Sequence, residues 1–210
     1  MNETTRERIL IAAAETFAET GFAGARIDEI AEKAGVNKAM LYYHVGSKED
    51  LYTAVLTETF DRGLSSIRAS VESAGTPAAK LQAILNTFAH FGSENPVFIP
   101  IVMREIASGG KHLPDEMVLR MASVFRLVGD TLRSGMEAGA FRRTDPLLTH
   151  VSLTGAMMFL IASHPVRQRV ARIAGVDAGA HTPAELAAHV GNLFLHGLTI
   201  TPAKAKKVKS

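Results

Sequence analysis

The chain has 210 residues, of which 47% are hydrophobic, and a formal net charge of +2 at neutral pH. This length and apolar content suffice to bury a sizeable core, so they exclude a largely disordered protein. Because the sequence contains no cysteine, it also excludes disulfide bridges and metal sites with cysteine ligands, and it favours a soluble, cytoplasmic protein.

The positive charge is concentrated at the carboxyl terminus. Lys204, Lys206, Lys207 and Lys209 lie in the last seven residues, and without them the rest of the chain has a formal charge of about −2. Residues 1–50 carry six Lys and Arg against nine Asp and Glu. Any DNA binding by this region therefore has to rest on a few placed cations. We interpret residues 201–210 as a disordered basic tail, with a DNA contact as the alternative.

No segment of the sequence is predicted to insert into a membrane. Residues 1–10 are polar and charged, unlike a signal peptide. The most apolar run, residues 147–162, is shorter than the roughly 20 residues of a membrane span. Polar residues also interrupt it, so a buried or partner-facing helix is the better interpretation.

Helical periodicity runs through almost the whole chain, and no run alternates apolar and polar residues as a half-buried strand does. The sequence therefore predicts an all-α protein. The first helix is expected to begin at Thr4, which has the spacing of a capping box with Glu7, and to stop at Gly21. A second helix of about two turns is expected over residues 27–34, with Gly35 as its left-handed cap.

A third, short helix is expected after Asn37, a favourable N-cap. Two short helices across a tight turn that contains glycine form the helix-turn-helix pattern, whose second helix lies in the major groove of DNA. Ser47 and Asp50 repeat the capping-box spacing, which predicts a long helix over residues 48–73. We expect a DNA-binding domain over residues 1–47, which the long helix connects to an effector-binding and dimerisation domain over residues 48–200.

The third helix carries an unusual set of side chains. At about 100° per residue, Leu41 and Val45 point together toward the core. We expect Lys38, Ala39, Tyr42 and Tyr43 to point away from the core. Small Ala39 permits close approach of the backbone, while tyrosine, histidine and lysine offer hydrogen bonds and charge to phosphates. Packing against neighbouring helices is the preferred explanation for a single tyrosine, but the whole set favours contact with DNA.

The stretch from Arg6 to about Phe60 resembles the amino-terminal domain of TetR-type transcriptional regulators. The resemblance rests on ILIAAAETFAETGF and on IDEIAEKAGVNKAMLYYHVGSKEDLY, over roughly fifty residues. The motif is matched at Gly21, Phe22, Ile30, Ala31, Ala34, Gly35, Val36, Leu41, Tyr42, His44, Lys48, Glu49 and Leu51. Three positions depart from it, with Arg26 in place of Ser or Thr, Ala39 in place of Gly and Val45 in place of Phe.

The resemblance implies a homodimeric repressor that binds a palindromic operator in double-stranded DNA and leaves it when a small, often hydrophobic effector binds. It implies DNA contacts at Arg26, Lys38, Ala39, Met40, Tyr42, Tyr43, His44 and Lys48. Within this set we expect Tyr42 and Lys48 at phosphates. Base edges or their vicinity are expected to be contacted by Lys38, Met40, Tyr43 and His44.

Beyond residue 75, periodicity and breaks predict helices over residues 77–92, 96–108, 115–138, 145–173 and 184–199, with a break at His164-Pro165 in the fourth. The middle helices are rich in Met and Phe, most of which are expected in an ordinary core, although Met packs adaptably around varied apolar shapes. The resemblance implies an effector pocket between these helices. The expected lining is Phe88, Phe91, Met103, Met121, Phe125 and Met157, with Arg104, Glu105 or His150 as polar contacts.

Residues 145–164 and 184–199 are apolar nearly all round, which favours a dimer interface or, equally, monomer core. A two-fold dimer with recognition helices about 34–36 Å apart can read successive major grooves of a palindrome. No motif of an enzyme, metal site or cofactor site stands out. An all-helical small-molecule carrier or a protein-binding adaptor is the alternative function, but either leaves Lys38, Tyr42, Tyr43 and His44 unexplained.

Overall fold

The structure, a computed structural model, describes residues 4–177, 179 and 181–200. In this part of the chain it contains ten α-helices and one isolated antiparallel bridge, between Phe141 and Thr199. The all-α fold expected from the sequence is confirmed. The expected basic tail, residues 201–210, lies outside the described residues.

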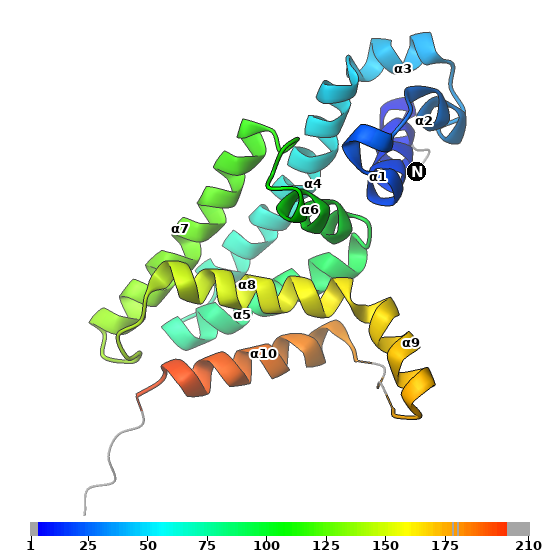
Figure 1. The fold of residues 1–210 in the computed structure, drawn as a ribbon. Coiled ribbons are helices and arrows are strands. Elements are labelled where there is room, and N and C mark those ends of the chain that lie inside the picture. Colours follow the sequence, from blue (N-terminus) through cyan, green and yellow to red (C-terminus); the bar gives the residue numbers. More distant parts are fainter. Residues whose placement is uncertain (1–3, 178, 180, 201–210) are drawn as a thin grey trace, which may run out of the picture.

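Three helices form the amino-terminal head: α1 (Thr5–Gly24), α2 (Ile27–Lys33) and α3 (Lys38–Val45) (Figure 1). The expected capping box between Thr4 and Glu7 opens α1. Gly21 has φ 73° and ψ 172°, so the regular helix ends there and α1 continues only to Gly24. Asn37 caps α3 by accepting a hydrogen bond from the Met40 N–H at 2.8 Å. These local contacts confirm the helix-turn-helix arrangement.

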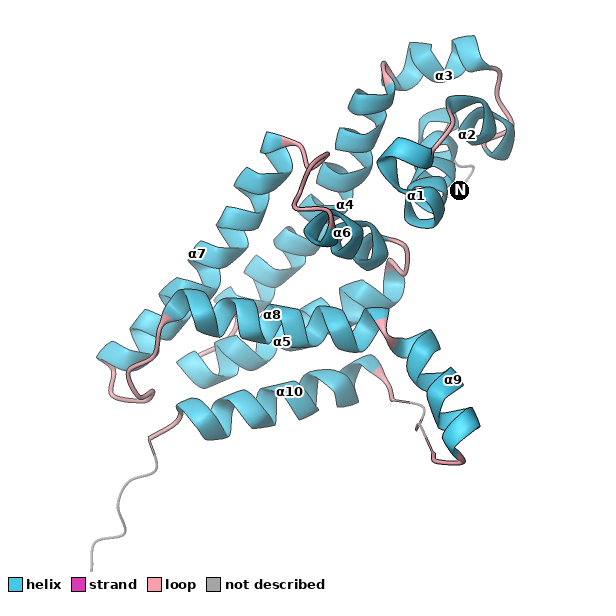
Figure 2. Ribbon diagram, viewed as in Figure 1, coloured by secondary structure: helices cyan, strands magenta, loops and turns pink. Residues whose placement is uncertain are grey.

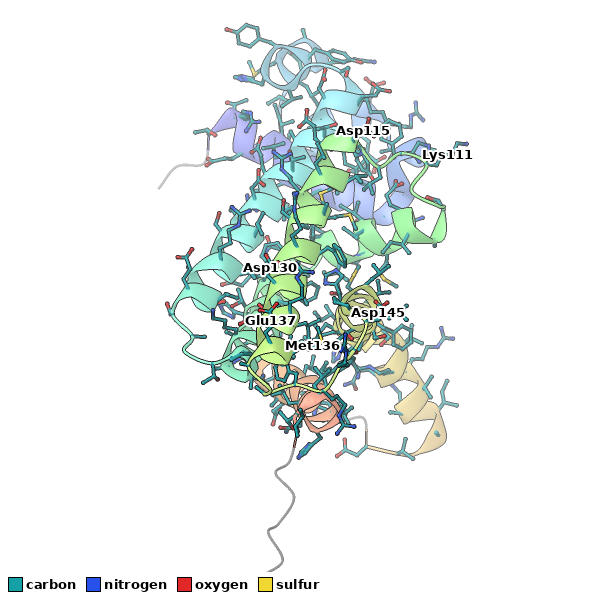
Figure 3. The ribbon with its side chains drawn as sticks, turned by 90° about the vertical axis from the view of Figure 1, so that its left-hand side faces the viewer. Lys111, Asp115, Asp130, Met136, Glu137 and Asp145 are labelled. Atoms are coloured by element: carbon teal, nitrogen blue, oxygen red, sulfur yellow. The ribbon has the colours of Figure 1, made fainter. Side chains whose placement is uncertain are left out.

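The long helix α4 (Lys48–Glu72) leads from the head into the body and begins with the expected capping box of Ser47 and Asp50. The body contains α5 (Pro77–Glu94), α6 (Phe98–Ala107), α7 (Asp115–Glu137), α8 (Pro146–Ala162), α9 (His164–Ala174) and α10 (Pro183–Leu198). Figure 3 shows α7 running from Asp115, near the head, to Met136 and Glu137 at the far end. Figure 2 shows α10 along α5 and α8, on the side away from the head.

The segment 145–173 is broken at Ser163, directly before the expected His164-Pro165, and the two resulting helices α8 and α9 are bent by 62°. Pro165 has no N–H to donate back into α8 and stands in the first turn of α9, where that loss is tolerated. Within the described residues no single helix is long and apolar enough to span a membrane, and only this bent pair reaches that length and composition together.

Two clusters of buried apolar side chains hold the molecule together. The first joins the head to α4 and α6 and includes Phe17, Leu41, Leu56 and Ile99. The second lies among α4, α5, α7, α8 and α10. Each fully buried Leu, Ile or Phe contributes about 1.5–3 kcal/mol relative to exposure. Because the first cluster contains side chains of both head and body, the head packs on the body and does not hang from a linker.

Replacing Gly135 with Ala is expected to destabilise the protein by about 2 kcal/mol, since overpacking costs about 1–3 kcal/mol and the gain in helix propensity is smaller. A Cβ at Gly135 would lie 2.1 Å from Cδ2 of Phe141, whose ring is buried and cannot swing into solvent. Gly129→Ala in the same helix is the control, because its Cβ would meet only the mobile end of Arg133, at 3.4 Å. Urea unfolding of both variants measures the difference, and equal stabilities would contradict this packing.

Candidate DNA-binding surface and ligand cavity

Helix α3 stands at the end of the molecule opposite α10 (Figure 1). Leu41 is fully buried and Val45 is half-buried against the first core cluster, as the helical phase predicted. On the other side Tyr43 is 87% exposed, Tyr42 44% and Met40 43%. Large apolar side chains at this exposure contribute little to the core, so this face is available to a binding partner.

The cations near α3 differ in their surroundings. The Lys38 ammonium lies 2.9 Å from Oδ1 of Asp28 in α2, and this hydrogen bond raises the pKa of Lys38. Lys48, at the start of α4, is half-buried and its ammonium lies 4.8 Å from the centre of the Phe22 ring. Arg26 is the exposed N-cap residue of α2 and makes no capping hydrogen bond through its side chain. Within the part of the chain that the structure describes, the Arg26 guanidinium makes no hydrogen bond or ion pair at this edge of the head.

All eight residues predicted to contact DNA lie on α3, at the N-cap of α2 or at the first position of α4. His44 is half-buried and its ring meets the Tyr43 ring edge-on, with centroids 5.3 Å apart. Ala39 is exposed, which leaves the backbone of α3 open to close approach. We call this surface, with Arg26, Lys38, Ala39, Met40, Tyr42, Tyr43, His44 and Lys48, the recognition surface. Its contacts with DNA stay a prediction.

A cavity in the body is lined by residues of α4, α5, α6, α7 and α8. The space open to the centre of a water molecule is about 90 Å³. Its lining is Phe60, Gly63, Leu64, Ile67, Phe88, Phe91, Phe98, Ile99, Val102, Met117, Met121, Val124, His150, Thr154 and Met158. Aromatic rings and methionine side chains make up much of this wall, which suits an apolar molecule.

Four of the nine residues expected around an effector line the cavity: Phe88, Phe91, Met121 and His150. The other five lie outside the cavity lining. Met157 is fully buried in the second core cluster, and Met103 packs against the first. Phe125 lies edge-on to the His150 ring, with centroids 5.5 Å apart. Helical phase alone does not separate these positions from true lining residues, because all of them face inward or along an interface.

The two expected charged contacts, Arg104 and Glu105, join the body to the head instead. The Arg104 guanidinium donates to the carbonyl oxygens of Ala18 and Glu19 in α1, at 3.2 and 3.1 Å. A Cβ at Gly21 would lie 2.8 Å from Cδ of Arg104, so a glycine is needed there for close approach as well as for its positive φ. Arg104 thereby connects α6 to the end of α1.

Glu105 is 2% exposed and accepts hydrogen bonds from the Tyr52 hydroxyl at 2.8 Å and the His112 N–H at 3.1 Å. Burial of Tyr52, together with its hydrogen bond to Glu105, raises the pKa of the Tyr52 hydroxyl. Phe22 packs between the rings of Tyr52 and His112, 5.0 Å from each. These side chains come from α1, α4, α6 and the loop after α6, so they form a junction between head and body. We call them the junction cluster.

Sequence reasoning missed much of the cavity wall on α4, where Phe60, Gly63, Leu64 and Ile67 all face it. Their spacing of three and four residues marks a single helix face, but this spacing does not distinguish a cavity wall from ordinary core. Gly63 has a specific role here, because a Cβ would lie 3.0 Å from the Phe91 ring. The glycine therefore leaves room for an aromatic ring in the cavity wall.

His150 is the titratable side chain of the cavity. Its Nδ1 is buried and has no hydrogen-bond partner within the described part of the chain. Burial lowers the pKa of His150 below its ordinary value, so the ring is held in its neutral form. Among the described residues, no group of three or more His, Asp or Glu side chains is placed to hold a metal ion.

The lowered pKa of His150 predicts a loss of stability in acid. Below about pH 6.5 the unfolded chain takes up a proton on this residue that the folded protein resists, so the free energy of unfolding falls as the pH drops. His150→Phe is expected to remove this part of the pH dependence. Thermal unfolding of both proteins between about pH 7 and about pH 5 checks it, and identical slopes would contradict it.

Comparisons with known proteins give matches to both the head and the body. Residues 9–55 match the family model described as bacterial regulatory proteins, tetR family, and residues 77–189 match the tetracyclin repressor-like C-terminal domain. The HTH-type transcriptional repressor NicS of Pseudomonas putida is 28% identical over 202 residues, 93% of each chain. The HTH-type transcriptional activator FasR of Mycolicibacterium smegmatis is 40% identical over 86 residues, which span 41% of this chain and 39% of FasR.

The fold is also found among solved structures. The ketosteroid transcriptional regulator KstR2 of Mycobacterium tuberculosis superimposes with a TM-score of 0.76 at 21% identity, covering 96% of this chain and 98% of that one. The fatty acid degradation regulator FadR from Bacillus halodurans gives a TM-score of 0.76 at 20% identity, over 94% and 97% of the two chains. At these identities the likeness concerns the fold alone.

Proposed function

Because this chain belongs to the TetR family of bacterial regulatory proteins, we propose that it is a repressor that binds a palindromic operator as a homodimer and leaves it when a small apolar effector occupies the cavity. Its role as a DNA-binding transcription regulator follows from the family. The observation that carries the proposal is the recognition surface, which presents Tyr43, 87% exposed, together with the cations of Arg26, Lys38 and Lys48.

The proposed dimer is supported by an apolar stripe on α8 and its neighbour α10. Leu148 is 65% exposed, Val151 56% and Phe159 62%, and their spacing places them on one side of α8. Leu193 of α10 is 63% exposed. An exposed stripe of this kind over two packed helices is typical of a protein interface. Two copies joined through it would present two α3 helices to one duplex.

Helix α6 offers a physical route from the cavity to the head. Phe98, Ile99 and Val102 line the cavity, while Arg104 and Glu105, in the last turn of the same helix, hold α1 and α4. An occupant that displaces α6 would pull on both contacts and shift the head. If the occupied cavity favours a different separation of the two α3 helices, operator affinity falls by that difference in free energy.

Selection of genomic fragments on the purified full chain tests the proposal. We expect enrichment of a palindrome, whose binding weakens steeply as salt is raised because the contacts to phosphate release counterions. Failure to enrich any fragment at low salt would contradict the regulator and favour the carrier or the adaptor. A promoter fusion then tests whether the protein represses or activates transcription. Deleting the gene for a repressor raises expression from the selected promoter, and deleting the gene for an activator lowers it.

A further inference from the structure

The polar side chains of the cavity are gathered on one helix. Among the described residues that line it, His150 and Thr154 are the two with polar side chains, and they stand on successive turns of α8, where positions four residues apart share a face. None of these lining residues is Asp, Glu, Lys or Arg. The cavity therefore has one polar wall and is apolar elsewhere.

His150 lines the cavity and has an unused hydrogen-bonding atom. Its Nδ1 is buried without a hydrogen-bond partner in the described part of the chain, a state that proteins rarely leave uncompensated, but the atom is closed even to water, so a ligand can pair with it only if the ring turns or the wall moves. The Phe125 ring, edge-on at 5.5 Å, holds the imidazole from the side but offers no acceptor or strong donor. Since burial lowers the pKa of His150, the ring carries one N–H and one lone pair. A neutral imidazole beside a hydroxyl can therefore both donate to and accept from one ligand group.

We propose that the effector is an uncharged, largely apolar molecule with a single hydrogen-bonding end, a hydroxyl or carbonyl group, which pairs with His150 and Thr154 on α8. Its apolar part lies among the rings of Phe88, Phe91 and Phe98, on the α5 and α6 side of the cavity. This inference rests on the proposed function, because it identifies the chemical class of the molecule that the cavity would take.

A charged effector does not fit this wall. A buried ion needs a partner of opposite charge or several hydrogen bonds, and none of the described residues in the lining supplies a charge. The two charged side chains at the end of α6 are already used, Arg104 by the carbonyl groups of α1 and Glu105 by Tyr52 and His112. In place of its hydration, a carboxylate or ammonium group would find only the hydrogen bonds of His150 and Thr154 and no opposite charge.

The size of the cavity limits the molecule as well. Its space of about 90 Å³ is smaller than the roughly 150 Å³ of a cavity that holds benzene. A one-ring molecule therefore enters only if the wall yields. Met117, Met121 and Met158 are flexible enough to do so, because an unbranched side chain has several rotatable bonds. One-ring compounds are accordingly the probes of choice.

Four probes with the same ring test the proposal: toluene, p-cresol, p-toluate and p-methylbenzylammonium. Their dissociation constants are measured by calorimetry on the full chain without DNA. We expect p-cresol to bind about tenfold more tightly than toluene, because its hydroxyl can pair with His150 whereas toluene has no polar group. We expect the two ions to show no binding. Equal affinity for p-cresol and toluene, tighter binding of an ion, or no binding of p-cresol at its solubility limit would overturn the proposal.

Variants assign the preference to α8. His150→Phe keeps a ring of similar size and removes its polar atoms, so the ratio of the two dissociation constants is expected to fall to about one, with toluene affinity retained. Thr154→Val, which is nearly isosteric, is expected to reduce the ratio in part. His90→Phe is the matched control, because His90 is an exposed residue of α5 that pairs with Glu94, and it is expected to leave the ratio unchanged.

Taking the ratio within each variant removes any general effect of the substitution on folding. If neither His150→Phe nor Thr154→Val changes the ratio, the assignment of the preference to α8 is overturned. The proposed regulator function is tested separately, by the fragment selection. A protein that selects no DNA but prefers p-cresol contradicts the proposed function alone, and one that selects a palindrome but prefers p-toluate contradicts this inference alone.

Discussion

Replacing Phe159 with Asp is expected to convert the protein into a monomer and to lower its operator affinity by about 100-fold or more, because an unpaired carboxylate buried in an interface costs several kcal/mol. Phe159 is 62% exposed and shares its side of α8 with Leu148 and Val151, so the folded monomer tolerates the charge. The operator affinity falls because one α3 helix reads too few base pairs to hold the duplex alone.

Analytical ultracentrifugation at micromolar concentration measures the first effect, and a fluorescence titration of the selected duplex measures the second. Leu119→Asp is the matched control, since Leu119 is 66% exposed on α7, outside the apolar stripe. We expect this control to stay dimeric and to bind DNA normally. A dimeric Phe159→Asp protein would refute the interface on α8, and a monomeric one with full operator affinity would refute the need for a dimer.

Replacing Tyr43 with Ala is expected to lower operator affinity by about 10- to 100-fold, the range for the loss of one base contact of about 1–3 kcal/mol. The stability of the free protein is expected to change by less than about 0.5 kcal/mol, because Tyr43 is 87% exposed and contributes little to the core. The combination distinguishes a binding residue from a structural one, since a packing tyrosine would lose both stability and binding.

The comparison of Tyr43→Ala with Tyr42→Ala separates two kinds of contact. If Tyr43 lies at base edges and Tyr42 at a phosphate, the first variant loses its preference for the operator over a scrambled duplex, while the second weakens binding to both alike. Ile106→Ala, at an exposed position on α6, is the control for an exposed apolar truncation and is expected to bind normally. Unchanged affinity in Tyr43→Ala would remove this residue from the recognition surface.

At Lys38, the predicted contact with DNA competes with an ion pair inside the protein. Lys38 is exposed, as expected, but it stands three residues before the buried Leu41, on the side of α3 that faces α2, and its ammonium is paired with Asp28 of α2. Reaching a base edge requires Lys38 to leave that carboxylate or to share it with the DNA. Phase along a helix predicts the direction of a side chain. Which partner the side chain meets depends on a second helix, and the residue spacing of α3 does not predict the angle at which the two helices cross.

The sequence by itself determined the parts of this protein that depend on neighbours three or four residues apart. The capping boxes of Thr4 and Ser47, the Asn37 cap, and the break before Pro165 are all contacts or constraints within one turn, so residue types and spacing sufficed to predict the helices. The long match around α2 and α3 likewise identified the family, because so many of its positions serve the local geometry of one small domain.

Only the tertiary structure decided which inward-facing residues surround the cavity and which hold the head to the body. Arg104 and Glu105 are adjacent in sequence, yet one reaches the carbonyl groups of α1 and the other the hydroxyl of Tyr52, 53 positions away. Met157 and Met158 are also adjacent, and only Met158 lines the cavity. Such assignments depend on how five helices cross. Crossing angles result from the packing of whole faces, which no single stretch of sequence contains.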